Sequence, residues 1–353
     1  MVIDKRYCMS SFLMYRTIAD KTKCFSQNIV PNIPNMNFKR DPISNSTELY
    51  NKLKQEVVDA TKDGKAALAL SGGIDSAILA KFMPKGSVAY TFKCVVPGKE
   101  VIDETKSAAK YAEECGLVHR VIEIYWEDFE KFSPMLMKHK GAPVHSIEIQ
   151  IYKASLQAKR DGFERLIYGE SADSAFGGLS NILSKEWRIG EFIERYQYVE
   201  PFKVLKDPIM VLEPIKTHEK DGYVDPHEFI STEFFRESIA SYINASESAD
   251  IDVVLPYAKC VMSQSIDYTR IRKGENKYLV REVFNRLYPN FVVPPKTPMP
   301  RPTNEWLKHW GGPKRPEFWP HCTDLMSGDS KWLVWILEYF LNMIDESVKK
   351  EIY

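Results

Sequence analysis

The sequence lacks the features that define several classes of protein. Its 353 residues hold 48 Lys and Arg against 48 Asp and Glu, so no positive excess favours binding to nucleic acid. No apolar run approaches the roughly 20 residues that a membrane-spanning helix needs. A short apolar patch near the N-terminus lies among charged residues and makes a poor secretion signal. We therefore expect a cytoplasmic protein that binds neither nucleic acid nor membrane.

The six cysteines include no C-x-x-C pair. They are scattered along the chain, at Cys8, Cys24, Cys94, Cys115, Cys260 and Cys322. That spacing argues against a metal-binding or disulfide framework, and reduced thiols are typical of the cytoplasm. Hydrophobic residues (44%) and aromatic residues (12%) are abundant enough for a sizeable core, which argues against disorder.

Short apolar runs alternate with amphipathic stretches in the first half of the chain. The predicted strands are 66–70, which is expected to be buried, 88–96, 119–125 and 165–168, and a predicted helix over 102–115 ends at Gly116. Strands that alternate with helices of this length indicate right-handed βαβ units and a parallel sheet.

The two ends of the chain follow other patterns. Pro31, Pro34 and Pro42 predict that residues 1–45 form an irregular lead-in rather than a helix. Beyond about residue 190 the alternation stops, and segments 277–288 and 331–348 have helical periodicity. The second of these carries an apolar stripe that is typical of a core helix.

The first polar motif is SGGIDS at residues 71–76, between a predicted strand and a helix. Its glycines allow a close backbone approach, and the free N–H groups of a helix start favour an anion. Asp75 would repel a bare phosphate, which suggests a divalent cation between them. The alternative is a turn that only caps the helix. The motif is not a Walker A loop, and it resembles the pyrophosphate loop of N-type ATP pyrophosphatases.

The second polar motif is GESADSAFGG at residues 169–178, after the fourth predicted strand. It resembles the GEGADExFGG segment of the asparagine synthetase family. Other features follow in the order of that family: YTF at 90–92, Asp103-Glu104, GLVH at 116–119, KYLVRE at 277–282 and Lys296 among prolines. The resemblance covers roughly residues 48–305, and other pyrophosphate-loop enzymes lack the second motif.

The resemblance implies an α/β fold: a doubly wound parallel five-stranded sheet of the adenine nucleotide alpha hydrolase type, with an α-helical C-terminal part. In strand order 3-2-1-4-5, strands one and four are neighbours and their outgoing loops diverge at a crevice. Asp75 and Asp173 would then face one Mg²⁺. The expected parts are 1–47, resembling the connecting tail of a glutaminase domain, 48–200, the ATP pyrophosphatase core, and 201–353, a mainly helical part that completes the site.

The resemblance also implies residue roles in an AMP-forming amide ligase that uses ATP and Mg²⁺. The implied nucleotide-binding residues are Leu70, Ser71, Gly72, Gly73, Asp75, Ser76, Cys94, Gly169 and Lys277, and the implied metal ligands are Asp75 and Asp173. Lys296 would stabilise charge as pyrophosphate leaves, and Glu170 would orient or deprotonate the attacking amine. The alternatives are a helix cap for Asp173, solvent-exposed lysines, and a structural hydrogen bond for Glu170.

Several positions depart from the family pattern. Position 2 is Val instead of the Cys of a glutaminase, and the lead-in is short. We therefore expect the nucleophile to be ammonia from solution, ammonia from a separate protein, or an amine on a second substrate. Ser174 replaces a Glu, Lys259 replaces an Asp, and an Arg is missing from 252–257, which suggests an altered small carboxylate substrate. The alternatives are an ammonia-dependent asparagine synthetase and a catalytically silent nucleotide-binding partner protein. A homodimer is possible.

Overall fold

The computed structural model describes residues 1–36, 38–295 and 298–352. Its central sheet consists of β4 (Ala66–Ala69), β5 (Val88–Cys94), β6 (Val118–Ile124), β7 (Arg165–Ile167) and β11 (Asp252–Val254). The strands are all parallel and lie in the order β11-β7-β4-β5-β6. Numbered along the chain, this is the order 3-2-1-4-5, so the predicted α/β class and parallel five-stranded sheet are confirmed.

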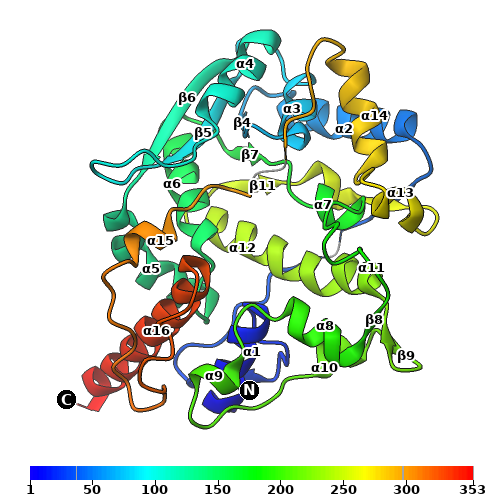
Figure 1. Ribbon diagram of the computed structural model, residues 1–353. Helices are drawn as coiled ribbons and strands as arrows, with labels where there is room; N and C mark the ends of the chain where they lie inside the picture. Colours follow the sequence, from blue (N-terminus) through cyan, green and yellow to red (C-terminus); the bar gives the residue numbers. More distant parts are fainter. Residues whose placement is uncertain (37, 296–297, 353) are drawn as a thin grey trace.

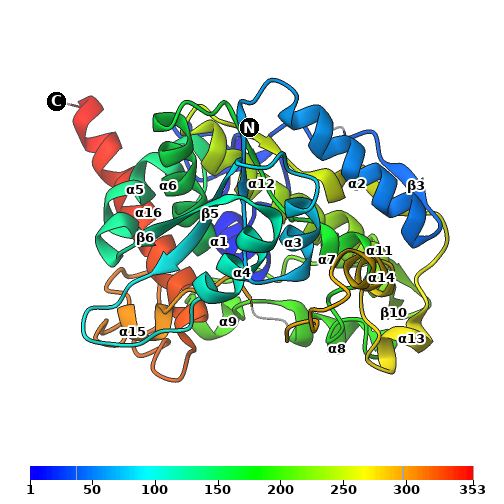
Figure 2. The ribbon, with the colours of Figure 1, turned by 90° about the horizontal axis from the view of Figure 1, so that it is seen from above.

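Helices cover both faces of the sheet (Figures 1 and 2). One face packs against α2 (Ser46–Thr61), α3 (Ile74–Ala80), α4 (Thr105–Cys115) and α14 (Tyr278–Leu287), and the other against α5 (Trp126–Lys140), α6 (Ser146–Arg160) and α12 (Phe235–Glu247). Successive side chains of a strand point to opposite faces. Accordingly, Leu68 of β4 belongs to the core with α2 and α3, whereas Ala67 and Ala69 belong to the core with α6 and α12.

The other elements are short, apart from the two terminal helices. The remaining strands are β1 (Val2–Ile3), β2 (Lys23–Cys24), β3 (Asp41–Ile43), β8 (Trp187–Arg188), β9 (Glu219–Lys220), β10 (Tyr223–Val224) and β12 (Cys260–Met262). The remaining helices are α1 (Lys5–Tyr15), α7 (Ala172–Ala175), α8 (Ile189–Tyr196), α9 (Pro201–Val204), α10 (Glu213–Lys216), α11 (Pro226–Phe229), α13 (Tyr268–Arg272), α15 (Thr303–Trp306) and α16 (Gly328–Ile352), with a π-helical turn (Ile230–Phe234) and a 3₁₀ turn (Pro256–Lys259).

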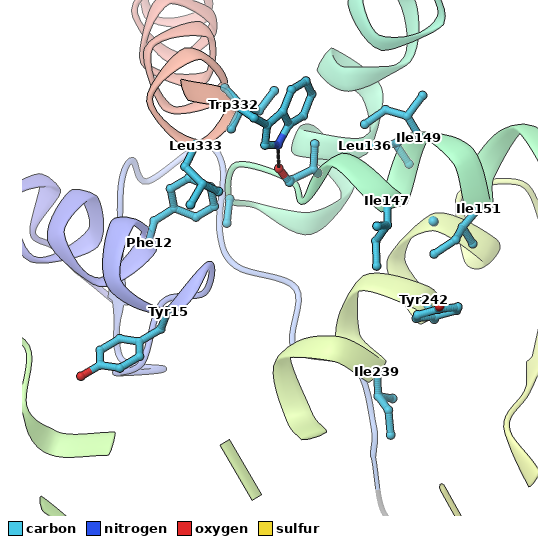
Figure 3. Close-up of a cluster of buried hydrophobic side chains, with 14 of the residues drawn as sticks. Phe12, Tyr15, Leu136, Ile147, Ile149, Ile151, Ile239, Tyr242, Trp332 and Leu333 are labelled. Atoms are coloured by element: carbon cyan, nitrogen blue, oxygen red, sulfur yellow. Dashed lines mark hydrogen bonds between the residues drawn. The ribbon is translucent and has the colours of Figure 1, made fainter. Parts of the chain in front are cut away.

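The sequence predicted an irregular lead-in over residues 1–45, and that prediction is wrong for the N-terminal segment. Helix α1 forms there, and the side chain of Asp4 caps it by accepting a hydrogen bond from the N–H of Tyr7 at 2.9 Å. Phe12 of α1 is fully buried next to Leu333 of α16 (Figure 3). Almost every residue of α1 is buried, so the helix has no exposed face and no amphipathic stripe that would predict it.

The C-terminal helix is a core element, as its apolar stripe predicted. Trp332 is 1% exposed and donates a hydrogen bond from Nε1 to the carbonyl of Val144 at 3.2 Å (Figure 3). The fifth strand of the expected sheet, to which no residues had been assigned, is β11 at residues 252–254, beyond the point where the alternation of strands and helices stops. Among the described residues, no helix combines the length and apolar character of a membrane span.

Candidate functional site

The loop after β4 is held in shape by its own hydroxyl groups. Ser71 Oγ accepts a hydrogen bond from the N–H of Gly73 at 3.1 Å, and Ser76 Oγ accepts one from the N–H of Ser71 at 3.0 Å. The two hydroxyl oxygens lie 2.9 Å apart. The Thr91 hydroxyl of β5 donates to the carbonyl of Leu70 at 2.7 Å. Because these bonds form within the protein, the loop is preorganised for a ligand.

The loop after β7 touches the loop after β4. A Cβ atom on Gly169 would lie 2.9 Å from the backbone nitrogen of Ser76 and 3.1 Å from the Cβ of Asp75. Only glycine therefore allows this approach. Ser171, two residues later, has a φ of +75°, an uncommon conformation for a residue other than glycine. The two sequence motifs thus form one site.

Two carboxylates from these loops meet at one ammonium group. The Nζ of Lys277 lies 2.9 and 2.7 Å from the two carboxylate oxygens of Asp75, and 3.1 Å from Oδ1 of Asp173. Lys277 is 6% exposed, and it precedes α14 with a left-handed φ of +53°. Gly178 leaves the space for the Asp173 side chain, because a Cβ there would lie 1.9 Å from Oδ1.

The charge of Lys277 is stabilised by this pairing. Burial acts to lower the pKa of Lys277, but the negative charges of Asp75 and Asp173 outweigh it and the pKa is raised. The lysine is therefore protonated at neutral pH. This corner of the cleft stabilises a cation between two acidic side chains. The predicted contact of Lys277 with phosphate stays a prediction.

The carboxylates of Asp75 and Asp173 are also suitable ligands for Mg²⁺. Magnesium prefers hard oxygen ligands, and it is commonly held by one or two carboxylates together with water and substrate phosphates. Among the side chains that the structure describes, which are those of residues 1–36, 38–295 and 298–346, no three His, Cys, Asp or Glu residues are grouped so that they could hold a metal. Asp75 and Asp173 thus suit a magnesium ion that arrives with phosphate oxygens.

Glu170 lines the site from the loop after β7 and faces α12. Its Oε1 accepts a hydrogen bond from the Ser238 hydroxyl at 2.9 Å. Burial raises the pKa of Glu170, although hydrogen bonds from the Ser171 backbone, Ser238 and Tyr242 act in the opposite direction. A raised pKa brings a carboxylate closer to the range of a general base at neutral pH.

Ten of the predicted site residues line one cleft of about 390 Å³ at the carboxyl ends of β4 and β7. This volume lies in the range of small-molecule sites. The predicted site residues in its lining are Leu70, Ser71, Gly72, Gly73, Asp75, Ser76, Gly169, Glu170, Asp173 and Lys277. A further wall comes from residues 102–104 and from prolines at 294, 295, 298 and 300.

One described residue of the predicted site, Cys94, is not part of this lining. Cys94 is 1% exposed, and its thiol donates to the carbonyl of Pro300 at 3.3 Å. Its expected backbone contact with adenosine stays a prediction. Lys296 lies outside the described residues, so its catalytic role also stays a prediction.

Two of the departures from the family pattern lie away from the cleft. Ser174 is buried, and its hydroxyl donates to the carbonyl of Ser171 at 3.1 Å. Lys259 pairs with Glu56 of α2 at 2.5 Å. Neither residue lines the cleft. Their replacement therefore gives no direct geometric support for an altered substrate.

The structure adds three residues for which no role had been predicted from the sequence. Glu104 lines the cleft beside Gly72, and burial raises its pKa to about 7. In the sequence, Glu104 was noted only as part of the Asp103-Glu104 pair that resembles the asparagine synthetase family. Ser238 and Tyr242 of α12 both act on Glu170. Their separation by four positions puts them on one helix face, but nothing in the sequence indicates what that face contacts.

The fold and the cleft define a nucleotide-type α/β site, with a glycine-rich loop and paired carboxylates at the point where the strand order of a parallel sheet reverses. The model of the family described as asparagine synthase matches residues 48–248, which is more than half of the chain. The chain belongs to the asparagine synthase family. It is thereby an ATP-dependent enzyme of the ligase type.

Two solved structures show a distant similarity. NMN synthetase from Francisella tularensis is 12% identical and aligns over 71% of this chain and 99% of its own, with a TM-score of 0.26. The U34-tRNA thiolase NcsA from Methanococcus maripaludis, solved with its 4Fe-4S cluster, is 14% identical over 71% of this chain and 83% of its own, with a TM-score of 0.25. Scores this low carry no argument about this chain. No curated protein matches the sequence significantly.

Proposed function

We propose that the protein is an AMP-forming amide ligase, which adenylates a small carboxylate, releases pyrophosphate and transfers the acyl group to ammonia or an amine. The observation that carries this proposal is the convergence of Asp75 and Asp173 on one cation, at 2.7 and 3.1 Å from Lys277. Paired carboxylates next to a glycine-rich loop suit a phosphate chain with Mg²⁺ better than they suit a bare anion.

The chemistry explains why ATP is needed. An amine does not displace oxide from a carboxylate, so one carboxylate oxygen first attacks the α-phosphorus of ATP and pyrophosphate leaves. The amine nitrogen then attacks the acyl carbon, AMP leaves with that oxygen, and a base takes the surplus amine proton. In this scheme Ser71, Gly72, Gly73 and Ser76 cradle the pyrophosphate, and Asp75 and Asp173 hold Mg²⁺.

Glu170 is the proposed partner of the amine. Its raised pKa and its hydrogen bond to Ser238 suit a group that orients the amine or accepts its proton. Lys296 is the proposed donor to the negative charge that develops as pyrophosphate leaves. Backbone groups of Leu70, Cys94 and Gly169 would contact the adenosine, and Lys277 the phosphates.

The identity of the substrates extends the proposal. We propose a carboxylate other than aspartate, in a specialised biosynthetic pathway, with ammonia from solution, ammonia from a separate protein, or an amine of a second substrate. A cytoplasmic location and a homodimer belong to the same proposal. So does the division into 1–47, 48–200 and 201–353, although β11 of the last part joins the sheet of the second.

The direct test is ATP–pyrophosphate exchange with a panel of small carboxylates, with and without ammonia. Exchange that depends on one acid, with amide formed only when an amine is present, supports the proposal. Asp75→Asn should abolish exchange, and Lys296→Ala should retain ATP binding but lower turnover by about 10²–10³-fold. Robust conversion of aspartate and ammonia to asparagine would identify a plain asparagine synthetase. ATP binding without exchange for any acid would identify a silent nucleotide-binding protein.

A further inference from the structure

A second cavity, also of about 390 Å³, lies against the other face of α12. Glu237, Ala240 and Asn244 of α12 line it and recur at intervals of three or four residues. Ser238 and Tyr242, which act on Glu170, fall on the opposite side of the helix. The other walls come from residues 17–21, 31–36, 140–142 and 213–217. This cavity is therefore separate from the candidate active site.

Two buried polar groups in the lining have no hydrogen-bond partner among the described residues. They are the hydroxyl of Tyr7 and Oε1 of Glu237, on side chains that are 3% and 4% exposed. Oε2 of Glu237, in contrast, accepts from Arg16 at 2.8 Å. Buried polar groups are nearly always paired, so this cavity calls for a polar occupant, and the carboxylate oxygen of Glu237 calls for a hydrogen-bond donor.

The charge of the lining favours a cation. Its acidic residues are Asp20, Glu213, Glu233, Glu237 and Glu247, against the basic residues Lys21, Lys140 and Arg236. Lys140 is already bonded to buried Glu148 at 2.6 Å, and Arg236 to Glu233 at 3.1 Å. Glu233 is paired with Arg236 and Glu237 with Arg16, so the lining charges outside these ion pairs are Asp20, Glu213 and Glu247 against Lys21, and a negatively charged ligand would meet net repulsion. Ile18, Met36 and Ile243 add apolar surface suited to an alkyl chain.

We propose that this second cavity binds a small aliphatic primary amine in its protonated form. The ammonium group donates to Glu237 Oε1 and the Tyr7 hydroxyl, and the alkyl chain packs on the apolar wall. An ammonium has three donors and no acceptor, which complements a carboxylate oxygen and a hydroxyl oxygen. No residue of the catalytic cleft takes part, so the amine site stands whether or not the ligase activity is as proposed.

The test is isothermal titration of the full chain with 1,4-diaminobutane, using 1,4-butanediol as the uncharged analogue. We expect saturable binding of the diamine and none of the diol. Tyr7→Phe should weaken diamine binding about 5–10-fold, the effect of one hydrogen bond, and leave the Tm unchanged or higher because the hydroxyl has no protein partner to lose. Ala240→Trp should fill the cavity and abolish binding. Tyr223→Phe, at an exposed tyrosine outside the lining, is the matched control.

Three results would overturn the amine site. One is absence of saturable diamine binding, which would mean that water alone fills the cavity. Another is equal binding of the diamine and the diol, or equal affinity of wild type and Tyr7→Phe for the diamine. The Tyr7→Phe measurement decides the question even if Ala240→Trp fails to fold. The third is competitive displacement of the diamine by Mg·ATP, which would place the diamine in the catalytic cleft instead.

Discussion

The ammonium nitrogen of Lys277 lies 2.7 Å from a carboxylate oxygen of Asp75, although 202 positions separate the two residues in the sequence. Asp75 opens α3 directly after the first strand of the sheet, and Lys277 precedes α14. The contact therefore joins the glycine-rich loop to the C-terminal part of the chain. Asp173, at 3.1 Å, adds the loop after β7 to the same cluster.

Lys277→Met should make the stability of the protein depend on Mg²⁺. Without the ammonium, two carboxylates face each other in a partly buried corner, which should lower the free energy of unfolding by about 1–3 kcal/mol. Magnesium can take the place of the lost cation, so added MgCl₂ should raise the Tm of the variant more than that of wild type. Thermal unfolding at constant ionic strength measures this. Lys259→Met, at a lysine paired on the surface with Glu56, is the control and should show no added response.

Gly169→Ala should separate the two loops. The new Cβ would lie 2.9 Å from the Ser76 nitrogen, so the backbone must shift, at a cost of about 1–3 kcal/mol in the free energy of unfolding. ATP binding should weaken as well, because the loop after β4 moves. Gly190→Ala in α8 is the control, since a Cβ there meets nothing within 4 Å and alanine favours a helix. Equal stability of the two variants in urea unfolding would contradict the loop contact.

Glu104→Gln should stabilise the protein at alkaline pH. Burial raises the pKa of Glu104 from 4.5 to about 7, so the folded protein holds this proton more tightly than the unfolded chain does. Stability attributable to this group is thus lost as the pH rises from about 4.5 through 7. At pH 8 the variant should be more stable by about 1–2 kcal/mol, allowing for solvent at the cleft, and the gain should vanish near pH 4.5. Urea unfolding at several pH values tests this. A gain independent of pH would contradict the raised pKa.

Ser238→Ala should shift the acidic limb of the turnover–pH profile to higher pH. The serine hydroxyl stabilises ionised Glu170 at 2.9 Å, so its loss should raise the pKa of Glu170 further. More alkaline conditions are then needed to ionise the proposed base. Ser241→Ala is the control, because that hydroxyl donates to the carbonyl of Glu237 within the helix. Lower turnover with an unshifted profile would show that Ser238 is only structural.

Local patterns predicted much of the fold, and the resemblance to the asparagine synthetase family implied most of the cleft. The segments that form β4, β5, β6 and β7 stand out as short apolar or β-branched runs, although β6 lies at the edge of the sheet and most of its residues are exposed or partly exposed. Gly116 ends α4 with a φ of +66° as expected. The adjacency of Asp75 and Asp173 follows from the strand order alone. Both loops leave the same edge of the sheet, and residues on neighbouring parallel strands must meet there.

The remaining features depend on contacts that no local pattern encodes. Strand β11 has three residues and is defined by its pairing with β7. Helix α1 is buried on all sides, so it has no polar face to set its period. The partnership of Lys277 with Asp75, and of Glu170 with α12, arises only when distant segments pack together.

The central claim is that Asp75 and Asp173 hold a magnesium-bound nucleotide together. Calorimetric titration of wild type, Asp75→Asn, Asp173→Asn and the double variant with Mg²⁺ and a non-hydrolysable ATP analogue tests it most directly. We expect each single variant to weaken binding at least tenfold, and the double variant to be little worse than either, a coupling of about 1 kcal/mol or more. Full affinity in either single variant, or losses that simply add, would contradict a shared cation.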